Sequence, residues 1–352
     1  MYGLKLVYTV NPGIEDIAAE EVVSELGGET NYEMLSGRVY HETSNYKLDA
    51  VLRLRSINRA MIYLWSGRIG RTVKDLSTIR ETLLHELRGL SHYVSPLSSF
   101  AVQTERVGDH EYTSMDINRI IGDIVIRRVV EETGRRPEVN LRTPEIVIGV
   151  FVKDESMIIG VVLTGTRSMH RRGYRVYDHP AALKPTLAYA MLAISGTKDK
   201  QVIVDPMCGG GTIAIEAALL HEDAEIHCYD KDPHHIQGAR YNALAAGVAR
   251  KIRFGVWDAR RIHELGLTFD HMILNPPYGI RYGDPIVIRK LYRDFLRSAW
   301  KALPEKGRIT MITTEYNFVN KIADEQGYRV VHQRTVQHGG LYPKIVVLEK
   351  NI

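Results

Sequence analysis

The chain has 352 residues and a formal net charge of +4, and its composition, 44% hydrophobic and 25% charged, is ordinary for a globular protein. This length exceeds a single typical hydrophobic core, so we expect two or three domains. The sequence has no apolar run of the roughly 20 residues that cross a bilayer, and residues 1–6 do not resemble the start of a signal peptide. We therefore expect a cytoplasmic protein that does not contact a membrane.

The cysteines and histidines indicate neither disulfides nor metal. The two cysteines, Cys208 and Cys228, suit a reducing compartment and are too few for a disulfide framework. No set of cysteines and histidines has the spacing of a zinc site, so we expect no metal. The mildly basic charge is compatible with RNA binding and would indicate it only where basic residues cluster.

Residues 1–66 show alternating strand and helix patterns. Residues 5–10 alternate as a strand, and apolar residues then recur at helical spacing over residues 14–26. Strands at 37–40 and 58–65, with a helix at 48–54 between them, complete a β-α-β-α-β order. This order predicts a ferredoxin-like domain over residues 1–66, without a visible catalytic set.

Residues 67–165 are predicted to form a second domain of mixed helices and strands. A helix is expected over residues 77–87, a strand over 99–105, and a longer helix from Ser114, which we interpret as its N-cap. Two further strands, 145–152 and 157–163, are predicted to pair as a hairpin.

A basic segment, residues 166–180, links this domain to the rest of the chain. Basic and aromatic side chains in one stretch suit phosphate contacts and stacking on bases, although a solvated connector between domains would also explain them. Because the segment lies where the two halves of the chain meet, we favour RNA binding. The predicted RNA-binding residues are Arg167, His170, Arg171, Arg172, Tyr174 and Arg175.

Two short peptides in residues 181–352 carry the chemistry. In residues 202–212 an apolar strand ends at Asp205, and a glycine turn leads into a helix at Thr212. Glycines let a ligand approach the backbone where a Cβ would collide with it. In residues 272–279 a second apolar strand ends in Asn-Pro-Pro-Tyr, where two prolines stiffen the loop.

The Asn-Pro-Pro-Tyr loop suits methyl transfer to a nitrogen. An amino group attached to an aromatic ring is a weak nucleophile because its lone pair is delocalised into the ring. The side-chain oxygen of Asn275 and the carbonyl of Pro276 can accept both N–H protons and so aim the lone pair. Tyr278, held by Pro277, offers a face on which a base swung out of its helix can stack.

Together the two peptides resemble motifs I and IV of the class I methyltransferases that use S-adenosylmethionine (SAM) to modify exocyclic or side-chain nitrogens. The resemblance implies a Rossmann-fold domain over residues 181–352 with a seven-stranded sheet whose last strand is reversed. It also implies SAM as cofactor, with S-adenosylhomocysteine as product. The implied cofactor-binding residues are Lys184, Asp205, Pro206, Met207, Cys208, Gly209, Gly211, Thr212, Asp230, Lys231, Asp258, Ala259 and Asn275.

The resemblance also implies individual roles. The glycine turn would face the methionine part of SAM, with Asp205 accepting from its amino group, while Asp230 would hold the ribose and Asp258 the adenine. Asp232, which directly precedes a proline, fits a helix cap better than Asp230 does. Cys208 is interpreted as structural, because the enzymes that attack cytosine C5 carry their cysteine nucleophile in other motifs.

A second resemblance covers the N-terminal half. Residues 100–107, the helix from Ser114, the hairpin and residues 170–175 resemble, in that order, a THUMP domain, an RNA-binding module of enzymes that modify tRNA and rRNA. This resemblance implies a tRNA substrate gripped at its acceptor stem and 3′ end. The expected architecture is α/β, with ferredoxin-like and THUMP modules of the α+β type before the methyltransferase domain, and we expect a monomer.

The Asn-Pro-Pro-Tyr loop limits the number of expected target nucleotides. With the Arg281-Tyr282-Gly283 stretch behind it, Asn-Pro-Pro-Tyr resembles the group that forms N2-methylguanosine at tRNA position 6. The sister group that acts at position 10 carries Asp-Pro-Pro-Tyr, and a related family acts on a 23S rRNA guanine, so both stay open as alternatives. Methyltransferases of adenine N6 or protein glutamine share the motif but lack a THUMP module. A non-catalytic RNA-binding protein is disfavoured, because the SAM-facing positions carry competent residues.

Overall fold

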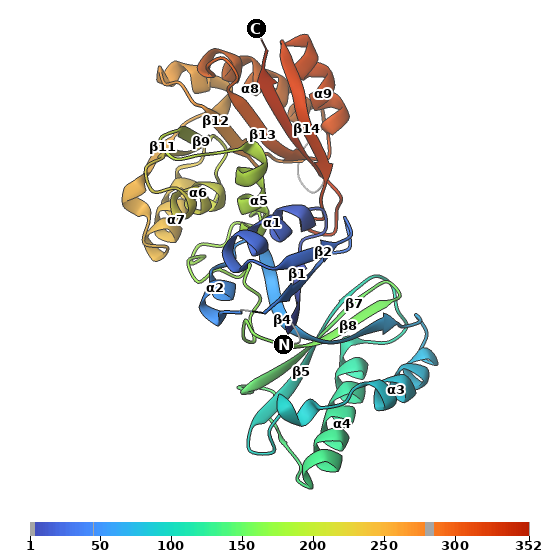
Figure 1. Cartoon of the computed structure of the whole chain (residues 1–352). Coiled ribbons are helices and arrows are strands. Elements are labelled where there is room, and N and C mark those ends of the chain that lie inside the picture. Colours follow the sequence, from blue (N-terminus) through green and yellow to red (C-terminus); the bar gives the residue numbers. More distant parts are fainter. Residues whose placement is uncertain (1–3, 45, 279–284, 352) are drawn as a thin grey trace.

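The computed structural model describes residues 4–44, 46–278 and 285–351. Within these residues the chain forms an eight-stranded sheet in its N-terminal half and a seven-stranded sheet in its C-terminal half. Figure 1 shows helices on both faces of the C-terminal sheet and the N-terminal half extending away from it.

The N-terminal sheet has the strand order β2-β3-β1-β4-β8-β7-β5-β6. Its elements are β1 (Leu4–Val10), α1 (Glu15–Leu26), β2 (Glu29–Tyr32), β3 (Arg38–Thr43), α2 (Leu48–Arg53), β4 (Ile57–Arg68), α3 (Asp75–Glu86), the 3-10 turn Leu90–His92, β5 (Ser99–Val107), α4 (Ser114–Thr133), β6 (Glu138–Val139), β7 (Ile146–Lys153) and β8 (Ser156–Val162).

The long strand β4 connects the two predicted N-terminal modules. It pairs antiparallel with β1 on one side and with β8 on the other, so a single sheet runs through both modules. Each module nevertheless has its own layer of helices, with α1 and α2 in the first and α3 and α4 in the second (Figure 1). The division at residue 66 stays a prediction.

Two local predictions in this half need correction. The N-cap of α4 is Thr113 rather than Ser114, because Thr113 Oγ1 accepts from the backbone N–H of Asp116 while the Asp116 carboxylate accepts from the backbone N–H of Thr113 at 2.8 Å. Strand β2 was not predicted. Among the described strands it pairs with β3 alone, and its residues are largely exposed, so it lacks the apolar alternation that marks a half-buried strand.

The C-terminal sheet has the order β11-β10-β9-β12-β13-β15-β14. Its elements are α5 (Pro185–Ser195), β9 (Val202–Asp205), α6 (Thr212–Leu220), β10 (Glu225–Asp230), α7 (Pro233–Ala245), the 3-10 turn Ala249–Lys251, β11 (Ile252–Val256), the 3-10 helix η3 (Ala259–Leu265), β12 (His271–Leu274), α8 (Pro285–Ala302), β13 (Arg308–Thr313), α9 (Tyr316–Glu325), β14 (Tyr328–Thr335) and β15 (Lys344–Lys350).

This sheet confirms the predicted class I topology. Strands β9 to β13 are parallel, whereas β15, the last strand in the chain, is antiparallel to both of its neighbours. Helix α9 was not predicted, although it completes the cover of the sheet beside β14. Because β9, β10 and β12 are parallel, their carboxyl ends meet at one edge, where open α/β sheets bind ligands.

The two halves of the protein are joined by direct contacts between α1 and the end of β14. The Arg334 guanidinium donates to both carboxylate oxygens of Asp16, at 2.6 and 2.8 Å. Gly13 has φ +100°, and a Cβ there would lie 2.2 Å from the carbonyl oxygen of Thr335. The backbones therefore approach so closely that only glycine fits at this position.

Candidate active site

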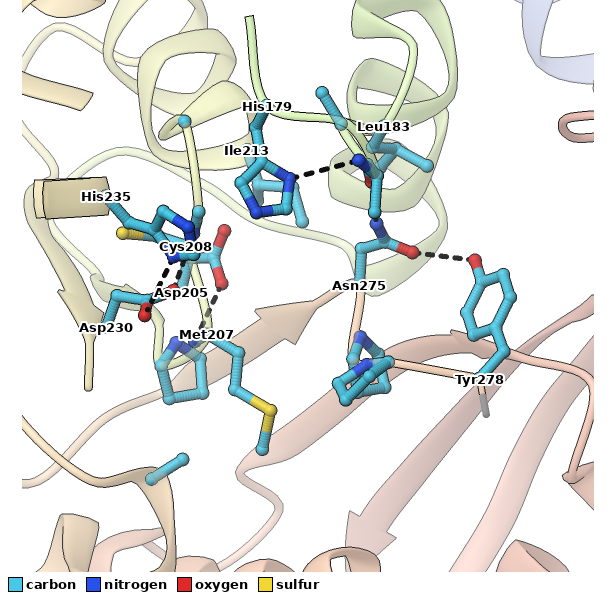
Figure 2. A pocket seen from close by; sticks show the side chains of 18 of the residues that line it. His179, Leu183, Asp205, Met207, Cys208, Ile213, Asp230, His235, Asn275 and Tyr278 are labelled. Atoms are coloured by element: carbon cyan, nitrogen blue, oxygen red, sulfur yellow. Dashed lines mark hydrogen bonds and ion pairs between the residues drawn. The ribbon is translucent and has the colours of Figure 1, made fainter. Parts of the chain in front are cut away.

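A cavity of about 750 Å³ lies at the carboxyl ends of β9, β10 and β12. This volume is in the range of small-molecule sites. Of the predicted site residues, the cavity is lined by Asp205, Pro206, Met207, Cys208, Gly209, Thr212, Asp230, Lys231, Asp258, Ala259, Asn275, Pro276, Pro277 and Tyr278. Figure 2 shows the carboxylates on one side of this cavity, with Asn275 and Tyr278 on the other.

Two predicted cofactor-binding residues do not line the cavity. Gly211 is the left-handed N-cap of α6, with φ +79°, and a Cβ there would lie 3.0 Å from the Cβ of Ala239, so this glycine packs the turn against α7. Lys184 precedes α5 and is half-buried just outside the cavity.

Asp205, at the end of β9, is a buried carboxylate with 3% exposure. Within the described part of the chain its carboxylate accepts one hydrogen bond, from the backbone N–H of Met207 at 3.2 Å. Burial raises the pKa of Asp205 well above its usual range, and the nearby Asp230 charge acts in the same direction. A carboxylate in such a place suits a cationic ligand, which would compensate its charge.

Asp230, at the end of β10, links the glycine turn to α7. Its carboxylate accepts from the backbone N–H groups of Gly209 at 2.9 Å and Asp232 at 3.0 Å, and the His235 ring lies 3.3 Å away (Figure 2). A carboxylate offers about four lone-pair sites, so Asp230 keeps capacity for a ligand. Asp232 caps α7 by accepting from the His234 N–H, as the sequence predicts.

Asp258 follows β11 and is more accessible than the other two carboxylates. The Arg260 side chain and backbone N–H both donate to it, and these hydrogen bonds lower the pKa of Asp258. Its side chain is 30% exposed. A ligand that binds Asp258 would therefore share it with Arg260.

The Asn275 side chain is held at both ends. Its Oδ1 accepts from the Tyr278 hydroxyl at 2.6 Å, and its Nδ2 donates to the Ala181 carbonyl at 3.1 Å (Figure 2). The Tyr292 hydroxyl, from α8, donates to the Pro277 carbonyl at 2.9 Å and so fastens the loop from behind. The amide oxygen therefore points in a defined direction before any ligand arrives. The Arg281-Tyr282-Gly283 stretch lies outside the described residues.

The cysteine at the glycine turn is buried. Cys208 is 7% exposed, and burial, together with the neighbouring Cys228 and Asp205, raises the pKa of its thiol well above the usual range. A protonated, buried thiol is a poor nucleophile. This environment agrees with a structural role for Cys208.

The sequence analysis did not identify several residues that line the cavity outside the two peptides. His179 packs edge-on against His235 with ring centroids 4.5 Å apart, and Ala181 holds Asn275. His338 and Leu341, from the connection between β14 and β15, also line the cavity. These residues belong to no motif and lie far from the two peptides in sequence, so the only available hint was that loops at this edge of such a sheet face ligands.

Part of the basic segment points into the protein and joins the N-terminal half to helix α6 of the C-terminal half. Tyr174 is 6% exposed, and its hydroxyl donates to the fully buried Glu216 at 2.8 Å. Arg172 forms an ion pair with Glu216 at 3.3 Å, and Arg55 forms another at 2.7 Å. Arg172 also donates to the Arg55 carbonyl. The polar groups of Tyr174 and Arg172 therefore bind partners within the protein.

The remaining residues of the predicted RNA-binding set differ in exposure. Arg167 and Arg171 are exposed, whereas Arg175 is partly buried 3.6 Å from Asp178. His170 is also partly buried, with its Nδ1 2.6 Å from Ser168 Oγ, and burial and the cations around it lower its pKa to about 4. Arg167 and Arg171 are the members of the set that remain available to phosphates.

Within residues 4–44, 46–278 and 285–351, no group of three or more His, Cys, Asp and Glu side chains could hold a metal ion. None of the helices that the structure describes is both long and apolar enough to span a membrane.

Comparisons with known proteins place this geometry among methyltransferases. Residues 172–344 match the family described as "RMKL-like, methyltransferase domain", and residues 90–162 match the THUMP domain. The tRNA (guanine(6)-N2)-methyltransferase of Archaeoglobus fulgidus is 34% identical over 96% of this chain and 90% of its own length. The enzyme of that name from Methanocaldococcus jannaschii is 30% identical over 97% of this chain and 98% of its own. The crystal structure of TrmN from Thermus thermophilus superposes with a TM-score of 0.78 at 29% identity and covers 99% of both chains.

Proposed function

The chain belongs to the family of the tRNA (guanine(6)-N2)-methyltransferases, and on that basis we propose that it methylates the N2 atom of a guanosine in tRNA, at position 6 of the acceptor stem. One observation carries this proposal. A buried carboxylate suited to a cation, Asp205, and an amide oxygen suited to an amino group, on Asn275, face the same cavity. Methyl transfer from SAM to an amino group requires a cofactor site and an acceptor for the amino group in one space.

The carboxylate side of the cavity fits SAM. When bound, SAM supplies a methyl group that its sulfonium has already activated. Asp205 would compensate the positive charge of the cofactor's methionine part, while Asp230 would accept from the ribose hydroxyls and Asp258 from the adenine amino group. The buried Asp205 carboxylate supports this assignment, because its charge has no cationic partner in the part of the chain that the structure describes.

The opposite side of the cavity receives the guanine. The Asn275 Oδ1 atom has two lone pairs, of which the Tyr278 hydroxyl uses one, so the second can accept a proton of the guanine amino group. The Pro276 carbonyl accepts the other proton, and the nitrogen lone pair is then free to point at the methyl group. Tyr278 holds the amide and lies beside the base. Much of the rate then comes from positioning two reactants that the protein holds in contact.

The N-terminal half grips the tRNA. Its THUMP domain binds the acceptor stem and the 3′ end, and the exposed Arg167 and Arg171 contact phosphates between that domain and the cavity. Arg172 and Tyr174 serve this arrangement by joining the two halves through Glu216. The protein acts as a monomer, a point that light scattering would test.

The proposal is tested by incubating the protein and SAM with an unmodified tRNA transcript, followed by nucleoside mass spectrometry and nuclease mapping. N2-methylguanosine at position 6 is the expected product. The same nucleoside at position 10 would retain the chemistry and refute the site. Label transferred only to rRNA or to protein would refute the tRNA substrate, and no transfer at all would refute an active enzyme.

A further inference from the structure

The methionine part of SAM carries a carboxylate as well as an amino group. The side chains of Asp205, Asp230 and Asp258 present only acceptors to the cavity when they are ionised, so they cannot bind this carboxylate. Like charges close to one another also disfavour each other. A cavity that takes SAM therefore needs a hydrogen-bond donor beside the glycine turn, where the methionine part would lie.

The ring of His179 lies over the glycine turn. A Cβ placed on Gly209 would be 3.5 Å from the ring atoms Cγ and Cδ2 and 3.6 Å from Cε1, and these nearly equal distances mean that the ring presents a face to this glycine. The ring also packs edge-on against His235, which lies 3.3 Å from Asp230. His179 is therefore on the cofactor side of the cavity, between the glycine turn and the end of β10.

One hydrogen bond determines which ring nitrogen of His179 carries a hydrogen. The backbone N–H of Ala181 donates to Nδ1 at 3.2 Å, so in the neutral ring Nδ1 is the acceptor and Nε2 carries the hydrogen. Burial and the neighbouring His235 lower the pKa of His179 from its usual value of about 6.5, so the ring is neutral near pH 7. His179 therefore offers a single N–H donor, and the backbone of Ala181 orients it.

This Nε2–H donor is accessible from the cavity. Among the residues that the structure describes, Nε2 has no hydrogen-bond partner, and it is not one of the unpartnered polar atoms that are fully buried. His179 lines the cavity, and Figure 2 shows its ring between the carboxylates and Asn275. A ligand in the cavity can therefore accept a hydrogen bond from Nε2–H.

We propose that His179 donates a hydrogen bond from Nε2–H to the carboxylate of the cofactor's methionine part and so fixes that end of SAM. Asp205 would bind the amino group of the same methionine part, so the two side chains together recognise an amino acid. A hydrogen bond to a carboxylate is stronger than one between neutral groups. The neutral imidazole supplies it without placing a second cation near the sulfonium. This inference rests on the proposed function, because it assumes SAM as the cofactor.

The test measures, by calorimetry, the binding of S-adenosylhomocysteine and of its decarboxylated analogue, in which an aminopropyl chain replaces the amino-acid chain. The analogue keeps the adenosine and the amino group and lacks only the carboxylate. The wild-type protein should bind S-adenosylhomocysteine more tightly than the analogue. His179→Ala should weaken binding of S-adenosylhomocysteine by roughly 10–100-fold, the range expected for losing a hydrogen bond to a charged group, and leave the affinity for the analogue nearly unchanged.

Three further variants sharpen this comparison. His179→Gln keeps a side-chain N–H donor and should recover part of the affinity for S-adenosylhomocysteine. His179→Phe keeps a ring over the glycine turn but has no donor, so it should show the same selective loss as alanine even if His179→Ala does not fold. His234 is exposed and lies outside the cavity, and His234→Ala should bind both ligands as the wild-type protein does.

Measuring both ligands on the same variant cancels any general change in the cavity. An equal loss of affinity for both ligands in the alanine and phenylalanine variants would overturn the inference, and so would equal affinities of the wild-type protein for the two ligands. Wild-type protein that binds neither SAM nor S-adenosylhomocysteine would refute the proposed function, and this inference with it. Binding of S-adenosylhomocysteine with the selective loss, but without methylation of tRNA, would refute the proposed function alone.

Discussion

The two sides of the catalytic cavity differ in charge. The side formed by the ends of β9, β10 and β11 presents the carboxylates of Asp205, Asp230 and Asp258. The side around the Asn-Pro-Pro-Tyr loop presents an amide on Asn275 and a phenol on Tyr278. Burial raises the pKa of Tyr278, so its phenol stays protonated and donates to Asn275.

This difference corresponds to the two proposed ligands, a cationic cofactor and an uncharged base. A buried carboxylate is costly unless a cation compensates it, so acidic residues gather where the cofactor's positive charge would lie. On the other side the groups of the Asn-Pro-Pro-Tyr loop itself are uncharged, although Lys290 of α8 also lines the cavity. The following predictions test this division.

The largest effect is expected at Asn275. Asn275→Ala removes the acceptor for the amino group, and methylation should slow by roughly 10²–10³-fold, as when one hydrogen-bonding group is removed from a preorganised site. SAM affinity, measured by calorimetry, should fall far less than the rate. Asn275→Asp is the matched variant. It keeps an oxygen acceptor but brings a charge to the neutral side, so its rate should lie between those of wild type and the alanine variant. A wild-type rate in Asn275→Ala would contradict the mechanism.

Removing the charge of Asp205 should weaken binding of the cofactor on the carboxylate side of the cavity. Asp205→Asn should lower SAM affinity by roughly 10–100-fold, because a charged hydrogen bond to the cofactor is lost. The exposed Asp223 offers a control, since Asp223→Asn should leave the affinity unchanged. Equal affinities in Asp205→Asn and wild type would refute the role of this carboxylate.

The same variant should be more stable than wild type without SAM. Burial raises the pKa of Asp205 in the folded state, so between its unfolded and folded pKa the folded protein binds more protons, and stability falls as the pH rises. At pH 7 the folded wild-type protein therefore bears the cost of burying this ionisable group, and asparagine removes that cost. Thermal unfolding should show a higher midpoint for the variant without SAM and a smaller increase when SAM is added.

Substitutions of Arg171 and Arg172 should distinguish a role in RNA binding from a role in joining the two halves of the protein. Arg171→Ala should weaken tRNA binding a few-fold and reduce the slope of log K against log salt by about 1, with unchanged stability. Arg172→Ala removes one partner of the buried Glu216 and should lower the free energy of unfolding by roughly 1–3 kcal/mol. Filter binding at several salt concentrations and urea unfolding measure the two effects. Identical behaviour of the two variants would contradict the inward orientation of Arg172.

The smallest effect is expected from titration of His338. Its pKa is about 4 in the folded protein, below its usual value, so on acidification the unfolded chain takes up a proton first. Stability should therefore fall as the pH drops from about 6.5 towards 4 and be unaffected by this group above that window. His170 and His271 act in the same direction. His338→Gln should lose less stability over this window, by on the order of 1 kcal/mol. The same pH dependence in both proteins would contradict a neutral His338.

Much of the fold could be predicted because it depends on local patterns. A few neighbouring residues are enough to identify the apolar strand before Asp205, the glycine turn and the proline-stiffened loop. Strand β2 could not be found in this way, because an exposed edge strand has no apolar alternation. The prediction of Ser114 as N-cap was wrong by one residue, since Thr113 and Ser114 carry the same hydroxyl and only the backbone geometry distinguishes them.

The sequence by itself determined the chemical groups of the site and the order in which they occur, since strand ends and turns depend on neighbouring residues. Only the tertiary structure decided which partners those groups have. Tyr174 belongs by composition to an RNA-binding patch, yet it is buried against Glu216, and His338 belongs to no motif, yet it lines the cavity. Both outcomes come from contacts between residues distant in the chain. Such contacts depend on how the sheets and loops pack, which no local pattern records.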